Sequence, residues 1–385
     1  MNDNKVKIIM WVADQAGCGW ARVKLPAKYL NEIYENEIEA ETSMIMNPNQ
    51  WVTMLDEEKK LYKKNYHLTV HQRQYGAPNL QNFRFLQNKL KIPCVYEIDD
   101  FLHGVHPESS AHFAYNKNIH KERFENIEAY LKESAAVTVT TEYLKKLYSK
   151  FNKNIYVLPN YLDFETLYTD EIRKLRNKNL EKHEENGEIW IGWAGSNTHL
   201  PDLKMAASAV VRIVNEYPNV KLALGGWDGL FRDKEGTVHN PETNPWKDIP
   251  ENKKVVIPWA KEMEDYPKML ANFDIGIAPL EDNDFNRAKS DIKFKEYSAC
   301  GVPTIASNVE PYTNAIKHGE NGLLVKTKGA VHHDWYKKIK RMVENKELRT
   351  RIAKTTTQKA IDEYDMKKNV WQWKEIYYEI IKRGI

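Results

Sequence analysis

The chain has 385 residues, which is enough for two domains of ordinary size, and 42% of them are hydrophobic, so it can bury substantial cores. Its net charge of +3 argues against nucleic-acid binding through bulk positive charge, although local basic patches stay open. No apolar run approaches membrane-spanning length, and the three cysteines match no metal-site spacing. We therefore expect no transmembrane segment, no metal site and a cytoplasmic location with buried free thiols.

The first half of the chain alternates short apolar runs with longer amphipathic ones, which is typical of an α/β protein with a parallel sheet. The predicted strands are Lys7–Val12, Glu41–Met46, Leu68–Gln72, Cys94–Ile98, Val137–Thr140 and Ile155–Leu158. The predicted helices are Ala21–Glu35, Gln50–Lys63, Asn79–Lys89, Ile119–Lys132 and Glu142–Phe151. The first apolar run lacks a cleavage-site pattern, which favours a first strand over a signal peptide.

The turn after the first strand is rich in glycine. Gly17 and Gly19 precede Trp20, where a helix is expected to begin. Glycine lets the backbone turn sharply and approach a ligand closely, and the first strand-to-helix turn is where α/β sheets place ligands. The sequence therefore predicts a binding turn at Gly19, with an ordinary tight turn as the alternative.

Polar residues follow two predicted strands of the first half at the points where the strands end. His71 and Arg73 lie at the end of one strand and just after it, and Asp99 and Asp100 follow another. Side chains at the carboxyl ends of parallel strands face the ligand crevice, so these four are candidate ligand-binding residues. The alternatives are a half-buried histidine and aspartates that cap a turn. The segment after them, residues 101–134, is expected to be a ligand-binding element or lid.

The stretch 165–188 is highly charged and poor in apolar residues, so we predict a linker there. A second α/β pattern follows it, with strands at Glu188–Trp193, Val220–Gly225, Val255–Ile257, Phe273–Ala278, Val302–Ala306 and Leu323–Lys326. The first predicted helix of this half begins near Pro201. The others cover Glu262–Ala271, Ser290–Cys300, Tyr312–Lys317, Asp334–Asn345, Glu347–Glu363 and Lys367–Lys382. The predicted domains are residues 1–164 and 189–365, with a terminal helix over 366–385.

The second half also has a polar strand-to-helix turn, in which Gly195 and Ser196 offer a close backbone approach and a hydroxyl to a diphosphate. Trp259 follows another strand and is expected either to stack on a base or to pack between domains.

Positive side chains surround the start of the helix predicted at Ser290. Arg287 and Lys289 precede it, Lys293 lies in its first turn, and Glu296 follows. Cations beside the free N–H groups of a helix start form a phosphate site, and a nearby acid suits ribose hydroxyls. The alternative is a solvated helix face.

The run AKSDIKFKEYSACGVPTIAS resembles the nucleotide-sugar site of GT-B glycosyltransferases of family 4, including versions from bacteriophages. That family separates two glutamates by seven residues. Glu296 matches the second, which is used on the donor ribose, but the first position holds Ala288, and Lys289 and Lys293 are expected to replace its role. The opening GCGWARVKLPAKYL and the run VLPNYLD also resemble this family.

The resemblance implies two Rossmann-like αβα domains that face a cleft, with a C-terminal helix that crosses back to the first domain. It implies a retaining enzyme that moves glucose from UDP-glucose to a hydroxyl, with no cofactor beyond the donor. The expected catalytic residues are Asp100, as a base, Lys289 and Lys293. The expected acceptor-binding residues are His71, Arg73, Asp99 and Asp100, with the segment 101–134 as an acceptor-binding element. The expected donor-binding residues are Gly19, Gly195, Ser196, Trp259, Arg287, Lys289, Ser290, Asp291, Ile292, Lys293 and Glu296.

The acceptor expected from the phage-like segments is a hydroxymethylated base in phage DNA, which would place the enzyme in the host cytoplasm. Basic and aromatic groups on the acceptor side could serve such a substrate: Arg73, Tyr75, Phe101, Lys117, Lys121 and Arg123. The alternatives are a polysaccharide or cell-wall acceptor, a nucleotide-sugar epimerase, and a non-catalytic nucleotide-sugar-binding protein. The oligomeric state stays open.

Overall fold

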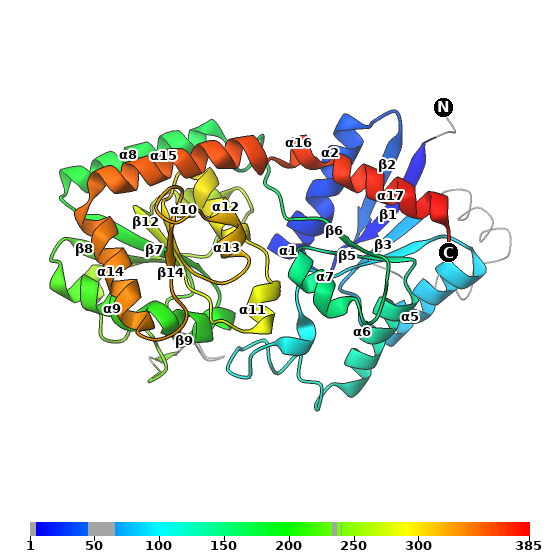
Figure 1. The fold of residues 1–385 in the computed structure, drawn as a ribbon, viewed down its shortest axis with the longest axis horizontal. Coiled ribbons are helices and arrows are strands. Elements are labelled where there is room, and N and C mark those ends of the chain that lie inside the picture. The colour runs from blue at the N-terminus through cyan, green and yellow to red at the C-terminus, as the bar shows by residue number, and fades with distance from the viewer. Residues whose placement is uncertain (1–4, 45–65, 233–236, 240) are drawn as a thin grey trace.

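Two six-stranded sheets, each covered by helices, make up the computed structural model of the protein (Figure 1). The structure describes residues 5–44, 66–232, 237–239 and 241–385. The helix expected at Gln50–Lys63 lies outside these residues, as does the end of the strand expected at Glu41–Met46.

The first sheet has the strand order β2-β1-β3-β4-β5-β6, and each neighbouring pair is parallel. Its strands are β1 Val6–Trp11, β2 Ile38–Ser43, β3 Leu68–Gln72, β4 Cys94–Glu97, β5 Ala136–Val139 and β6 Ile155–Val157. The prediction of β3 is confirmed residue for residue. β2 begins earlier than expected because Ile38 and Ala40 alternate inward across Glu39, which extends the strand pattern.

Helices cover both faces of the first sheet (Figure 1). They are α1 Gly17–Gly19, α2 Leu25–Ile33, α5 Ala77–Arg84, α6 Lys121–Glu133 and α7 Glu142–Tyr148. Short π-helical turns, Trp20–Lys24 and Phe85–Lys89, lie in the stretches expected as continuous helices, and a 3-10 turn forms at Leu102–Gly104. Thr141 caps α7, because its hydroxyl accepts the Leu144 N–H.

The second sheet has the order β11-β8-β7-β12-β13-β14, again with parallel neighbours. Its strands are β7 Ile189–Gly195, β8 Val220–Gly226, β11 Lys254–Ile257, β12 Ile275–Ala278, β13 Thr304–Ser307 and β14 Leu323–Val325. A small antiparallel pair, β9 Phe231–Arg232 and β10 Val238–His239, stands apart.

The helices of the second half follow the predicted pattern with one addition. They are α9 Leu200–Glu216, α10 Asp265–Leu270, α11 Asp284–Ala288, α12 Ile292–Ala299, α13 Tyr312–Ala315, α14 Val331–Glu344 and α15 Lys346–Glu363. Two short 3-10 turns form at Asn197–His199 and Glu251–Lys253. The addition is α11, which occupies a stretch expected as a loop, because Asn283 caps it by accepting the Asn286 N–H.

The stretch expected as a linker contains α8, Asp170–Glu185, which packs on the second domain. His183 is buried and bonds Asp274 at 2.9 Å, and the Asn179 side chain donates to the carbonyl of Ala271. These polar contacts, together with the apolar packing of Ile172 and Leu175, hold a helix whose composition is typical of an unstructured connector.

The C-terminal end crosses back to the first domain, as expected from the resemblance. α15 leads to α16 Met366–Asn369 and α17 Trp371–Arg383, which lie over α2 and the first sheet (Figure 1). Trp373, Tyr377 and Ile380 are buried in the first-domain core. The resemblance implied this crossing, and the prediction is confirmed. None of the described helices has the length and apolarity needed to cross a bilayer.

Candidate functional site

The two domains touch at the carboxyl edges of their sheets, through loops of the first domain. The Ser109 hydroxyl donates to the carbonyl of Thr198 at 3.0 Å, and Lys204 pairs with Glu108 at 2.6 Å. The segment expected to be an acceptor element therefore contacts the turn that carries Ser196, and the predicted acceptor and donor sides lie next to each other.

The turn after β7 is fixed by its own backbone. Gly195 ends the strand, its carbonyl accepts the Trp227 N–H at 3.0 Å, and a side chain there would begin 2.7 Å from the Trp193 ring. The Ser196 hydroxyl shares a 2.7 Å hydrogen bond with Thr198. This turn thus presents exposed backbone and a hydroxyl ahead of α9, which is the geometry expected of a diphosphate cradle.

Lys293 reaches this turn from α12. Its ammonium donates to the carbonyl of Ala194, and it has no ion pair among the described residues. Burial lowers the pKa of Lys293 to about 8, with Lys289 adding to the effect and Glu296 opposing it. A desolvated cation without a carboxylate partner is well placed to bind an anionic group.

Glu296 lies one turn further along α12. The Tyr266 hydroxyl donates to its carboxylate at 3.0 Å. Burial raises the pKa of Glu296 to about 7, against the opposing charge of Lys293 and hydrogen bonds from Tyr266 and Tyr168. The structure therefore brings Glu296, Lys293 and the Gly195 turn together.

Lys289 lies in the same group but already has a partner, Asp202, at 3.7 Å. Asp202 is buried in the first turn of α9, where it also bonds His199 at 2.9 Å and Asn286 at 2.6 Å. Burial would raise its pKa, but the Lys289 charge and the His199 bond hold the pKa of Asp202 at about 2. Sequence reasoning missed Asp202, although an acid in the first turn after a polar strand end is a usable signal.

Four residues expected to bind the donor have other partners in the structure. Arg287 pairs with Asp282 at 2.7 Å, Ser290 accepts a hydrogen bond from Asn160 at 2.9 Å, Asp291 pairs with Lys295 at 3.0 Å, and Ile292 packs against the second-domain core. The expected cap at Ser290 is not formed, since α12 begins at Ile292 with Asp291 at its N-cap.

Ala288, where the resemblance expects a glutamate, is fully buried against the first domain. Its carbonyl accepts the Thr141 hydroxyl at 2.9 Å. A carboxylate at this position would lie inside the domain contact without solvent, which is a costly place for a charge. The alanine therefore fits the way the two domains pack.

Trp259 borders a shallow hollow of about 310 Å³ at the end of β11. Its ring is 55% exposed and covers Gly226, whose positive φ of 91° and lack of a side chain leave room for the ring. Gly226 is the neighbour of Gly195 across the strand pair β7–β8. The exposed ring therefore stands at the same sheet edge as the Gly195 turn.

On the first-domain side, Arg73 gathers three carboxylates. Its guanidinium lies 2.9 Å from Asp14, 3.3 Å from Asp99 and 3.6 Å from Asp100, and its backbone has a φ of +44°. Burial and the Asp99 charge raise the pKa of Asp100, while Arg73 and then Lys289 oppose the rise. Lys289 of the second domain and Asp100 of the first therefore lie within electrostatic reach of each other.

The expectation that His71 binds an acceptor is wrong for this structure. His71 is fully buried and packs against Trp11, Phe83 and Tyr130. Burial lowers its pKa to about 3. Successive residues of a strand face opposite sides of the sheet, so a polar cluster after a strand does not point one way.

Gly19 is needed for the shape of the turn after β1. A side chain at Gly19 would collide with the backbone oxygen of Asp14, while its N–H donates to the Asp14 carboxylate at 3.1 Å. The same carboxylate group pairs with Arg73, so the glycine turn holds Asp14 in the acidic cluster around Arg73.

A buried polar chain, missed from the sequence, joins the domains. The Arg22 guanidinium is 1% exposed, binds Glu97 through two hydrogen bonds of 2.8 and 3.0 Å, and donates to the Asn160 side chain at 2.9 Å. Asn160 then donates to Ser290, and its carbonyl accepts from Lys295 at 2.8 Å. The helix that carries Lys293 and Glu296 is thereby tied to the first domain.

Comparison with known proteins bears on the second half most directly. Residues 173–359 match the family model for glycosyl transferases group 1. No curated protein matches the chain in sequence.

Several solved structures share the whole fold. Sucrose-phosphate synthase from Thermosynechococcus elongatus has a TM-score of 0.65 at 13% identity, over 99% of this chain and 100% of that one. The Anabaena protein HepE, solved with UDP-glucose, has a TM-score of 0.63 at 16% identity over 98% of both chains. A glycosyltransferase from Rickettsia africae has a TM-score of 0.62 at 17% identity, over 99% of this chain and 100% of that one. The chain thus has the GT-B fold, and its second half carries a match to group 1 glycosyl transferases.

Proposed function

We propose that this protein is a retaining glycosyltransferase that moves glucose from UDP-glucose to a hydroxyl group of an acceptor. The family match and the fold support a nucleotide-sugar glycosyltransferase. The observation that carries the proposal is the half-buried Lys293, whose ammonium donates to the Ala194 carbonyl beside the Gly195 turn, with Glu296 one helical turn away. That combination suits a diphosphate beside a ribose.

In this proposal the donor lies along the carboxyl edge of the second sheet. Lys293, Lys289 and the backbone around Ser196 bind the diphosphate, Glu296 accepts hydrogen bonds from the ribose hydroxyls, and Trp259 stacks on the base. Arg287, Ser290 and Asp291 act more remotely, because each already has another partner.

The reaction breaks the bond between the anomeric carbon and the diphosphate oxygen. The acceptor oxygen forms its bond to the same carbon on the same face, and its proton passes to Asp100. The diphosphate leaves with the bonding electron pair, so charge develops next to Lys293 and Lys289, which are already in place. The raised pKa of Asp100 suits a carboxylate that takes a proton.

For the acceptor we propose DNA with hydroxymethylated bases, ahead of a polysaccharide. The support is the resemblance of the AKSDIKFKEYSACGVPTIAS run and of the opening GCGWARVKLPAKYL to bacteriophage enzymes, together with Tyr75 and Arg123 on the acceptor side. Arg73 does not contribute, because three carboxylates surround it, and Lys117 pairs with Glu128 at 3.2 Å.

The test is a mass-spectrometric screen of the purified protein with UDP-glucose and other nucleotide-sugars. Hydroxymethylated DNA and candidate saccharides serve as acceptors, and the DNA is digested to nucleosides. Transfer with retained anomeric configuration supports the proposal. Interconversion of free nucleotide-sugars without transfer would show an epimerase instead, and no turnover of any donor would show a binding protein. Transfer to a saccharide alone would overturn the choice of DNA.

A further inference from the structure

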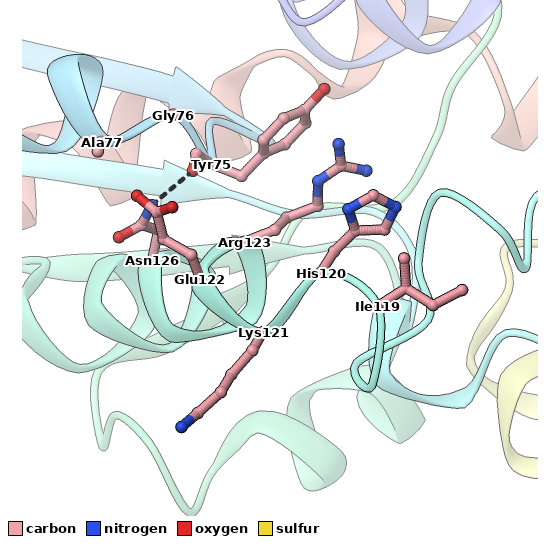
Figure 2. Close-up of a pocket in the computed structure, with 9 residues that line it drawn as sticks. All are labelled: Tyr75, Gly76, Ala77, Ile119, His120, Lys121, Glu122, Arg123 and Asn126. Atoms are coloured by element: carbon pink, nitrogen blue, oxygen red, sulfur yellow. Dashed lines mark hydrogen bonds between the residues drawn. The ribbon is translucent and has the colours of Figure 1, made fainter.

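A hollow of about 470 Å³ lies on the first domain, between the loop that follows β3 and the start of α6 (Figure 2). Its lining consists of Tyr75, Gly76, Ala77, Asn126 and residues 119–123. The Asn126 side chain donates to the carbonyl of Tyr75 at 3.0 Å and so ties the two walls together. The hollow is therefore bounded by segments that hold each other in place.

Arg123 is held in one orientation at this hollow. Its guanidinium lies 4.5 Å from the centre of the Tyr75 ring and 5.9 Å from that of Tyr115, and it donates to the carbonyl of Ala114. In contrast to Arg73, it has no ion pair among the described residues. Since a guanidinium carries five N–H donors in a rigid fork, Arg123 retains donors that suit an anionic group.

Tyr115 connects this hollow with the acidic cluster around Arg73. Burial raises the pKa of Tyr115, and the charges of Arg73, Asp100 and Arg123 also act on its hydroxyl. Tyr115 therefore lies within electrostatic reach of both Asp100 and the hollow.

We propose that the hollow binds a phosphate group of the acceptor, with Arg123 paired to the phosphate oxygens and Tyr75 packed beside the adjoining ring. This inference rests on the proposed function for the identity of the bound molecule as an acceptor. Glu122 is the one carboxylate among the residues that line the hollow, and its negative charge offsets part of the positive charge there. A nucleotide of DNA and a phosphorylated saccharide share the required chemistry.

The experiment measures binding of a fluorescein-labelled single-stranded oligonucleotide that contains 5-hydroxymethylcytosine, without donor. Arg123→Gln should weaken binding by roughly tenfold or more, the range for a lost charged hydrogen bond. Lys132→Gln is the matched control, because it removes one positive charge from the same helix outside the hollow. It should change binding less than about twofold, and Glu122→Gln should strengthen it.

A second probe separates a specific phosphate contact from general attraction. The same oligonucleotide with neutral methylphosphonate linkages should bind the wild type more weakly, and Arg123→Gln should then have little further effect. Equal losses from Arg123→Gln and Lys132→Gln would overturn the proposal. Thermal melting and UDP affinity serve as folding controls, since the hollow lies outside the donor site.

The outcomes also separate this proposal from the proposed function. If the protein neither binds nor turns over UDP-glucose, the function is wrong, while the oligonucleotide data still decide whether the hollow binds phosphate. If glucose 6-phosphate binds in place of the oligonucleotide, with the same dependence on Arg123, the phosphate comes from a saccharide. Failure of the wild type to bind either probe would overturn the proposal.

Discussion

At the scale of single residues, the proposed donor site depends on two half-buried groups of opposite charge. Lys293 and Glu296 are one turn apart on α12, and each acts on the pKa of the other. Burial moves both pKa values toward neutrality, so a small environmental change alters the charge of either group. Their roles can be separated because the proposed partners differ, a diphosphate for Lys293 and a ribose for Glu296.

Glu296→Gln should weaken UDP binding by roughly 10-fold or more, because a charged acceptor of the ribose hydroxyls is lost. The fold should persist, since glutamine can keep the hydrogen bond from Tyr266. Titration calorimetry with UDP measures the effect, and Glu320→Gln, an exposed site of the same domain, is the control. Unchanged UDP affinity in folded Glu296→Gln protein would reject the ribose role.

The pH dependence of stability should report the same carboxyl. Burial raises the pKa of Glu296 to about 7 from its ordinary value of 4.5. Between these values the folded protein keeps a proton that the unfolded chain releases, so the free energy of unfolding should fall as pH rises. Glu296→Gln should remove a decrease on the order of 2–3 kcal/mol, measured by urea unfolding near pH 5 and pH 7. Parallel pH curves for wild type and variant would contradict the assignment.

Substitution of both Lys289 and Lys293 by alanine should lower kcat by about 100-fold or more, with a smaller rise in the donor KM. The reason is that charge on the diphosphate grows in the transition state, where fixed cations act most strongly. Steady-state kinetics with UDP-glucose measures the split, and Lys317→Ala, whose side chain is 79% exposed, is the control. Near-normal turnover in the double variant would show that the two lysines do not stabilise the leaving diphosphate and belong to an ordinary solvated helix face.

At the scale of elements, short polar segments position the groups that longer helices carry. The glycine turn after β1 holds Asp14 against Arg73, and α11 brings Ala288 into the domain contact. Both segments have few apolar residues. The Asp14 carboxylate and the lack of a side chain at Gly19 set the shape of the first, and the Asn283 cap sets the shape of the second.

Gly19→Ala should destabilise the protein by about 1–3 kcal/mol, because the added methyl group collides with the Asp14 backbone. Gly17→Ala is the matched control two residues away, where an added Cβ meets nothing within 4 Å. It should be neutral or slightly stabilising, since alanine favours the helical turn. Urea unfolding compares the two variants, and equal stabilities would show that the turn relaxes around the methyl group.

At the scale of the whole molecule, the two domains are joined by polar contacts as well as by the C-terminal helices. Asn160 is the centre of the buried chain that runs from Glu97 through Arg22 to Ser290 and Lys295. Such a chain fixes the orientation of α12, and hence of the donor groups, relative to Asp100.

Asn160→Ala should lower kcat while leaving UDP affinity nearly unchanged, because the donor residues stay together but lose their alignment with the first domain. Its cost in unfolding free energy should be about 1–3 kcal/mol, as for other buried hydrogen bonds left unpaired. Asn179→Ala is the control, since it removes side-chain hydrogen bonds that do not involve the first domain. Equal kcat values for the two variants would show that Asn160 is only structural.

Local patterns in the sequence determined much of this protein. Short apolar runs that alternate with amphipathic ones predicted both parallel sheets. This was possible because the spacing of apolar residues within a short window distinguishes a strand from a helix. The run around Glu296 predicted the helix α12, and the resemblance to GT-B enzymes indicated that the C-terminal helix packs on the first domain.

Tertiary structure alone decided which polar groups meet. Arg73 and Asp14 are 59 residues apart, and Asn160 and Ser290 are 130 apart, so no local pattern reports their pairing. The same holds for the burial of His71 and for the packing of α8, whose composition is typical of a linker. Hydrogen bonds and desolvation act through space between segments that only the fold brings together, and for this reason the charge state of the site follows from the three-dimensional arrangement.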